Sequence, residues 1–236
     1  MNYRFDDWLT LGIKAHQEGK LEIAAEHFGK AAEIAEKPVD HVTALFNKGI
    51  TLGQMGKSDE EIAVYDEMTK RYGDDPEAGV RERVVNALVN KGIALDLMGE
   101  NEKAIAVYDE VVKRYGDAQE AGVREQVVGA LNGKGFRFLC AAKKVWQAGD
   151  ETTARAILAK ALLDIEAALV RKSDNPICLG NQGYILFLQG KVKEAGEILA
   201  KAILLGGEKL RKNELEDADI HPLPQDGAFK ALINSL

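Results

Sequence analysis

The chain of 236 residues is 46% hydrophobic and 29% charged, with a formal net charge of −7. This length and hydrophobic content are enough for a sizeable core, in one domain or two. A negative sum with interleaved signs argues against a nucleic-acid surface, because binding to phosphates requires a basic face. Aromatic residues are scarce and Ala, Leu, Glu and Lys dominate, which favours helices over strands.

The N-terminal sequence predicts a cytoplasmic protein. It has acidic residues at Asp6 and Asp7 and lacks the basic and apolar stretches of a signal peptide. No run approaches the ~18 apolar residues that span a bilayer, so we expect no membrane partner. Cys140 and Cys178 have no CxxC spacing, which favours two free thiols in a reducing compartment over a disulfide.

The first predicted element is a helical hairpin over residues 5–38. Apolar residues at helical spacing follow Trp8, and Gly19 predicts a left-handed C-cap that ends the first helix. In the second helix, the small Ala24 allows close approach and the large Phe28 fills the space between the two helices. Neither helix can bury both of its faces alone, so neighbouring hairpins must stack.

The next two hairpins, predicted over 42–84 and 85–127, are near copies. Residues 44–86 and 87–129 are identical at 28 of 43 positions. Gly73 and Gly116 are interpreted as C-caps, and Asp74 or Asp75 with Pro76 as the start of the following helix. The added nine residues predict about two and a half extra turns at the start of that helix.

One substitution separates these two copies at the helix–helix contact. Glu61 takes the place of the small residue that the next copy supplies as Ala104. A glutamate needs more room than an alanine, so we expect the Glu61 site to be more open.

The fourth and fifth hairpins are predicted over 128–172 and 175–207. Gly135 and Gly149 are 14 residues apart instead of seven, which predicts two extra helical turns on the same face. Asn175–Pro176 interrupts the chain before the fifth hairpin. The alternation of small and large residues resumes in the fourth copy at Ala154, Leu158 and Ala161.

The tail, residues 208–236, follows the pair Gly206–Gly207. We expect a polar helix, a Pro-containing linker at 217–225 and a short amphipathic helix that includes Phe229. Terminal repeats expose an apolar face that needs a cap, so capping is the favoured role of this tail.

The repeated pattern resembles the tetratricopeptide repeat. The first copy matches the family motif at eight places and the last copy at seven: Trp8, Leu11, Gly12, Ala15, Gly19, Ala24, Phe28 and Ala31, then Leu179, Gly183, Leu186, Gly190, Ala195, Leu199 and Ala202. This resemblance implies an all-α fold, a right-handed superhelical solenoid of about five hairpins over residues 1–207 with C-terminal capping helices over 208–236.

In a superhelix of this kind, the first helices of the hairpins line the concave surface. The alignment places mainly apolar residues there, so a partner groove is the favoured interpretation. The alternative is that longer helices tighten the superhelix and bury these residues as core. The groove candidates are Ile13, Phe46, Ile50, Val89, Ile93, Phe136, Tyr184 and Phe187.

Asparagines recur close to the conserved glycines, at Asn47, Asn90 and Asn181, with Asn132 one residue out of register. In family members that bind extended peptides, asparagines at this position hydrogen bond to the peptide backbone. The resemblance implies that role here, because an amide both donates and accepts. The alternative is an amide that caps or bridges neighbouring helices.

The family's clamp for peptide C-termini requires a lysine and an asparagine where this chain has Leu9 and Ile13, so that specialised function is not expected. Another column holds Lys48, Lys91 and Lys134 at the place of the usual leucine. We favour ion pairs between these lysines and second-helix acids such as Asp66 and Asp109. Contact with an acidic ligand is the alternative.

The sequence contains no catalytic or metal-binding motif. Its four histidines, His16, His27, His41 and His221, have no partner at ligand spacing, so neither an enzyme nor a metal or other cofactor is expected. We therefore expect a scaffold that binds a peptide or protein segment. The rival is a self-assembling module that forms a homo-oligomer by filling its groove or ends with another copy, and a third option is a regulatory domain of a larger complex.

Overall fold

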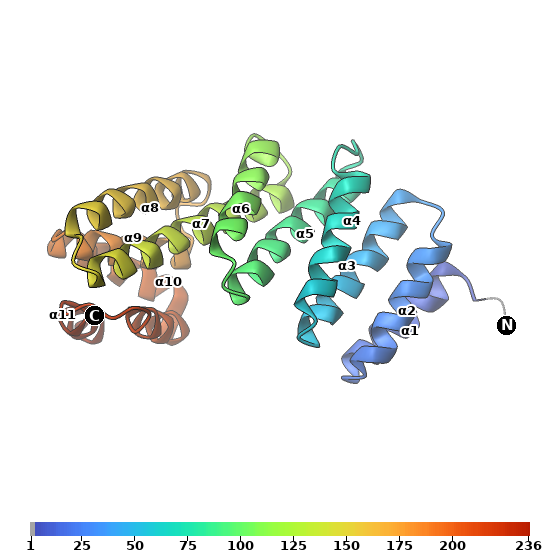
Figure 1. Ribbon diagram of the computed structural model, residues 1–236, viewed down its shortest axis with the longest axis horizontal. Helices are drawn as coiled ribbons and strands as arrows, with labels where there is room; N and C mark the ends of the chain where they lie inside the picture. Colours follow the sequence, from blue (N-terminus) through green and yellow to red (C-terminus); the bar gives the residue numbers. More distant parts are fainter. Residues whose placement is uncertain (1–2) are drawn as a thin grey trace. The chain divides into compact units, whose positions relative to one another are not determined.

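The computed structural model describes residues 3–236, and all regular secondary structure in this range is helical, which confirms the all-α prediction (Figure 1). The eleven helices of the described residues are α1 (Phe5–Gln17), α2 (Leu21–Ile34), α3 (Pro38–Gln54), α4 (Ser58–Tyr72), α5 (Ala78–Leu97), α6 (Asn101–Tyr115), α7 (Ala121–Gln147), α8 (Glu151–Arg171), α9 (Pro176–Leu188), α10 (Val192–Ala218) and α11 (Asp226–Ser235). None of the helices in this part of the chain is long and apolar enough to cross a membrane.

The chain forms two compact units, one up to Gln126 and the other from Val127 onward. In the first unit α1 packs on α2, α3 on α4 and α5 on α6, and each hairpin also packs on the next. In the second unit α9 packs on both α8 and α10, and α10 on α11. Each unit thus buries its apolar faces by stacking hairpins, as the pattern predicts.

Glycines end the first helices of the hairpins, as expected. Gly56 adopts a φ of 73°, and the amide of Lys57 then donates to the carbonyl of Leu52 at 2.9 Å. Gly149 does the same after the long α7, with a φ of 93°. A residue with a Cβ is strained in this left-handed region, which is why glycine recurs at these turns.

A second glycine in each first helix allows the close approach of the two helices. A Cβ added at Gly12 would lie only 2.6 Å from the ring of Phe28. Gly49 lies in the same way against the buried ring of Tyr65. The large residue of the second helix therefore packs directly on the backbone of the first.

The fourth hairpin keeps this contact with a different partner. Helix α7 has 27 residues against 20 for α5, the two extra turns that the glycine spacing predicts. The residue that packs on Gly135 is Ile165, two turns beyond Leu158, and a Cβ at Gly135 would lie 2.7 Å from it. The side chains of Leu158 and Ile165 are fully buried. The lengthening of α7 thus shifts the contact along α8 by the same number of turns.

The region between α4 and α5 corrects the sequence interpretation. Gly73 is the C-cap of α4, but its φ of −57° is right-handed, and a Cβ there would lie 2.5 Å from the carbonyl oxygen of Thr69. Helix α5 begins at Ala78 after an N-cap at Glu77, later than Pro76. Asp75 instead accepts a hydrogen bond of 2.9 Å from the Glu77 amide, which holds a turn where helix was expected.

The expectation of an open site at Glu61 is wrong. Glu61 is buried, and it fits because the facing residue of α3 is Gly53, where a Cβ would lie 2.6 Å from the carboxylate. Burial raises the pKa of Glu61, while a hydrogen bond with Tyr65 opposes the shift. The absence of a side chain at Gly53 on α3 thus leaves room for the carboxylate of Glu61.

The tail folds onto the second unit. Helix α10 is kinked at Gly207, whose φ is 64° and ψ −162°, and α11 follows a linker after Ala218. The side chains of Phe229 and Ile233 on α11 are fully buried.

Candidate functional site

The predicted asparagines of the first unit occupy equivalent places in consecutive hairpins. Asn47 of α3 and Asn90 of α5 are both half-buried. The Asn47 Nδ2 donates to the carbonyl of Thr43 at 3.0 Å, and the Asn90 Nδ2 donates to the Tyr65 hydroxyl at 3.5 Å. Neither side-chain oxygen has a partner among the described residues, so both remain acceptors.

Isoleucines lie one helical turn after these amides. Ile50 is half-buried, and Ile93 keeps 47% of its surface exposed. We call Asn47, Ile50, Asn90 and Ile93 the amide face. Since α3 and α5 pack on each other, the amide face combines hydrogen-bond acceptors with apolar surface from adjacent helices.

Two of the groove candidates on the same helices lie in the core. Phe46 and Val89 are buried, and the Phe46 ring lies 6.3 Å from that of Tyr65. The guanidinium of Arg83 lies over the Phe46 ring at 5.4 Å. Ile13 of α1 is exposed.

The candidates of the second unit are mostly covered by its own C-terminal helix. The Tyr184 ring stacks on Phe229 of α11 at 4.2 Å, and Phe187 meets the same ring edge-on at 5.3 Å. Phe136 of α7 is half-buried under the guanidinium of Arg137, which lies 4.7 Å from its ring. In this arrangement Tyr184 and Phe187 are core residues.

The third predicted asparagine also has a partner inside the protein. Asn181 is buried, and its Nδ2 donates to Oδ1 of Asn132 at 2.9 Å. Asn132 of α7, which is one residue out of register in the sequence, therefore pairs with the in-register Asn181 of α9. Asn181 bridges helices, whereas Asn47 and Asn90 reach the surface.

A buried polar cluster fastens α11, and no sequence pattern indicated it. Lys143 of α7 is 1% exposed, and its Nζ donates to the Tyr184 hydroxyl at 2.5 Å and pairs with Asp226 Oδ2 at 3.3 Å. The Tyr184 hydroxyl donates to Asp226 Oδ1 at 2.6 Å, and the Leu223 amide donates to Oδ2. Burial lowers the pKa of Lys143, and Asp226 opposes that shift. The only hint in the sequence is a lysine in the apolar run around Cys140.

A second buried acid lies nearby on α10. Glu214 packs against Gly180 of α9, where any Cβ would overlap its carboxylate. Burial, with a smaller contribution from Asp217, raises the pKa of Glu214 to about 8. Such a group is largely protonated at neutral pH, which removes the cost of burying a charge.

The described residues contain no group of three or more His, Cys, Asp or Glu that could hold a metal ion. The buried His41 hydrogen bonds to the Tyr72 hydroxyl at 3.0 Å, and burial lowers its pKa. On its amide face the first unit offers amide acceptors beside aliphatic side chains, and this chemistry suits an extended polypeptide.

Comparisons with known proteins agree with the fold of stacked helical hairpins. The tetratricopeptide repeat family model matches residues 86–118. MamA 41-end from Desulfovibrio magneticus RS-1 is 18% identical, with 87% of this chain and 97% of that chain covered at a TM-score of 0.55. A putative kinesin light chain of Podosopora anserina with nearly identical TPR-like repeats is 12% identical, with coverages of 89% and 99% and a TM-score of 0.59. No curated protein matches the sequence.

A third solved structure covers nearly the whole chain. The Assembly Chaperone of RpL4 (Acl4, residues 1–338) is 15% identical, with 99% of this chain and 89% of that chain covered at a TM-score of 0.57. At these identities the likeness concerns the fold.

Proposed function

Since the chain is a tetratricopeptide repeat protein by its matched repeat and by its fold, we propose that it is a non-catalytic scaffold whose amide face binds an extended peptide segment of a partner protein. The observation that carries the proposal is the pair Asn47 and Asn90. Their side-chain oxygens, equivalent in consecutive hairpins, are without partners among the described residues. Each can accept a hydrogen bond from a peptide N–H.

The apolar part of the amide face supports the same function. Ile50 and Ile93 offer aliphatic surface beside the amides, so a partner can bury its own apolar side chains next to its bound backbone. Backbone hydrogen bonds give affinity with little sequence preference, and the isoleucines add selection for apolar residues.

The test is a selection of displayed random peptides on the wild-type protein, followed by affinity measurements with the variant Asn47→Ala/Asn90→Ala. We expect selected peptides to lose roughly 1 kcal/mol per amide, about 30-fold in total, with an unchanged melting temperature. Asn181→Ala is the matched control, since Asn181 bonds inside the protein, and it should leave the affinity unchanged. Peptides that bind the double variant as tightly as the wild type would refute the amide face.

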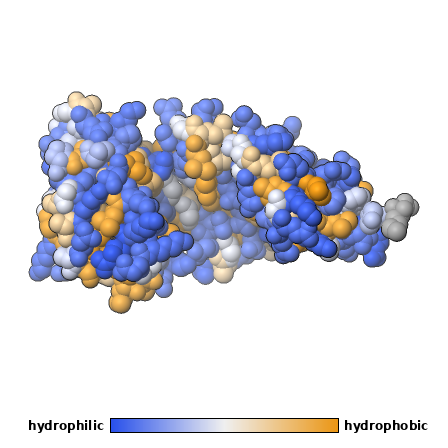
Figure 2. Space-filling view, turned by 90° about the horizontal axis from the view of Figure 1, so that it is seen from below, coloured by the Kyte–Doolittle hydropathy of each residue, from blue (hydrophilic) through white to orange (hydrophobic). Residues whose placement is uncertain are grey.

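Self-association is a second candidate, favoured by one observation on α8. Leu163 and Val170 lie two turns apart on this helix and are 67% and 84% exposed. Apolar side chains also reach the surface in patches among hydrophilic ones in the space-filling view (Figure 2). Light scattering over a range of concentrations tests this candidate: the mass should rise with concentration, and Leu163→Gln/Val170→Gln should abolish the rise. A mass that is constant in the wild type excludes it.

A further inference from the structure

The lysine column has one member without a counter-charge. Lys91 of α5 pairs with Asp66 of the preceding hairpin, and Lys134 of α7 pairs with Asp164 at 3.2 Å. Lys48 of α3 occupies the same place one repeat earlier. Among the described residues its Nζ has no hydrogen-bond or ion-pair partner.

The cause is a glycine in the first hairpin. Asp66 follows the large residue Tyr65, and the residue that follows the equivalent Phe28 is Gly29. A Cβ added at Gly29 would lie 3.9 Å from the Lys48 Nζ, an ordinary contact distance. The amine of Lys48 therefore faces the place where an aspartate would pair with it, and that place is empty of side chain.

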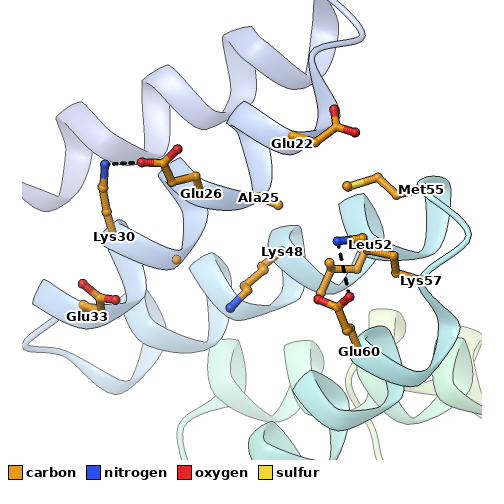
Figure 3. Close-up of a pocket in the computed structure, with 11 residues that line it drawn as sticks. Glu22, Ala25, Glu26, Lys30, Glu33, Lys48, Leu52, Met55, Lys57 and Glu60 are labelled. Atoms are coloured by element: carbon orange, nitrogen blue, oxygen red, sulfur yellow. Dashed lines mark hydrogen bonds and ion pairs between the residues drawn. The ribbon is translucent and has the colours of Figure 1, made fainter.

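The missing side chain leaves a pocket of about 370 Å³ between α2, α3 and α4 (Figure 3). In the close-up Lys48 lies between the ion pairs of Lys30 with Glu26 and of Lys57 with Glu60, which are 2.5 Å and 3.3 Å long. Those two lysines are thus already neutralised. The remaining lining residues are Glu22, Ala25, Gly29, Glu33, Leu52 and Met55.

We propose that this Lys48 pocket is a second binding site, which takes an acidic side chain of a peptide segment in the place that Asp66 fills one repeat later. The carboxylate replaces the absent aspartate on Lys48, and Leu52 and Met55 contact the aliphatic part of the ligand. Glu22 and Glu33 at the same pocket repel further acids and attract bases, so the preferred segment has one carboxylate flanked by lysines or arginines. None of these residues belongs to the amide face.

The probe is the blocked peptide acetyl-Lys-Ala-Glu-Ala-Lys-amide, compared with the same peptide carrying Gln for Glu. In a titration followed by amide NMR shifts, the Glu peptide should perturb Gly29, Lys48 and Leu52 and bind about tenfold more tightly than the Gln peptide. Lys48→Met should abolish that difference. Gly29→Asp should also abolish it, because the new carboxylate pairs with Lys48 internally.

Two controls separate this site from the alternatives. Gly29→Ala adds only a Cβ in ordinary contact, so it should keep the preference for Glu while Gly29→Asp loses it. Asn47→Ala/Asn90→Ala should have no effect, so this proposal and that of the amide face can fail independently. Equal binding of the Glu and Gln peptides to the wild type, or an undiminished preference in Gly29→Asp and Lys48→Met, overturns the proposal.

Discussion

The hydroxyl of Tyr108 on α6 donates a hydrogen bond of 2.9 Å to Oδ2 of Asp96 on α5. In the preceding copy Tyr65 also hydrogen bonds to a carboxylate, but that of Glu61 from its own helix. Gly53 then stands where the later copy has Asp96, and Glu61 where it has Ala104. The two copies keep the tyrosine–carboxylate pair and exchange the helix that supplies the acid.

This exchange predicts that Ala104→Glu is destabilising alone and tolerated with Asp96→Gly. The single variant forces two carboxylates into one closely packed site, and we expect a loss of about 2–4 kcal/mol of unfolding free energy. The double variant reproduces the arrangement of Gly53 with Glu61, so most of the loss should be recovered. Urea unfolding of both variants measures this. A double variant no more stable than the single one would show that the exchange is not compensatory.

The raised pKa of Glu214 predicts that stability falls as the pH rises. The pKa is about 8 in the folded state against 4.5 as the reference value, so the folded state binds more protons between these values. The contribution of Glu214 to the free energy of unfolding should therefore be fully present below about pH 4.5 and be lost as the pH rises to about 8. Glu214→Gln removes this contribution and should gain up to about 4 kcal/mol over the wild type on going from about pH 5 to about pH 9.

Urea unfolding of both proteins at the two pH values gives the comparison. Asp217 also has a pKa raised by burial, so the wild type keeps some pH dependence from other groups, and the difference between the proteins is the relevant quantity. Identical pH profiles for wild type and Glu214→Gln would contradict the protonated buried acid.

The cluster around Lys143 predicts strong coupling between α7 and α11. Asp226→Ala leaves a buried ammonium without its counter-charge and should cost about 3–5 kcal/mol. Lys143→Met/Asp226→Ala should cost clearly less than the sum of the single changes. The matched control is the exposed pair of Lys230 and Asp219, where Lys230→Met should cost less than about 1 kcal/mol. Additive effects at the buried pair, measured by chemical unfolding, would argue against the coupling.

The hydrogen bond between Asn181 and Asn132 predicts a structural role for Asn181. Asn181→Ala leaves Oδ1 of Asn132 without its donor and should lower the unfolding free energy by roughly 1–2 kcal/mol. Asn132→Ala should have a similar effect, and the double variant little more than either. A melting temperature that Asn181→Ala leaves unchanged would sink this assignment.

Local features of the fold could be predicted because they depend on neighbours in the sequence. The left-handed turn at Gly56 and the close contact of Gly49 with Tyr65 follow from spacing within one hairpin. The two extra turns of α7 follow from the distance between Gly135 and Gly149 in the same way.

Features that depend on two partners could not be predicted in this way. The hydrogen bond from the Glu77 amide to Asp75 favours a turn over an earlier start of α5. A difference of one hydrogen bond is too small to predict from helix propensities. The sequence predicts an open site at Glu61 because it does not show that Gly53 of α3 lies opposite the carboxylate. Lys143 and Asp226 lie in different elements far apart in sequence, so only the folded chain shows that Tyr184 and Phe187 are covered.

The same long separation has a consequence during synthesis. Lys143 is synthesised well before Asp226, so the ion pair that joins α7 to α11 can form only after α11 has left the ribosome. Non-local contacts of this kind delay the final step of folding. A chain shortened before Asp226 would keep the aromatic rings of α9 uncovered and the ammonium of Lys143 unpaired, a state that chaperones and proteases can distinguish from the chain that includes α11.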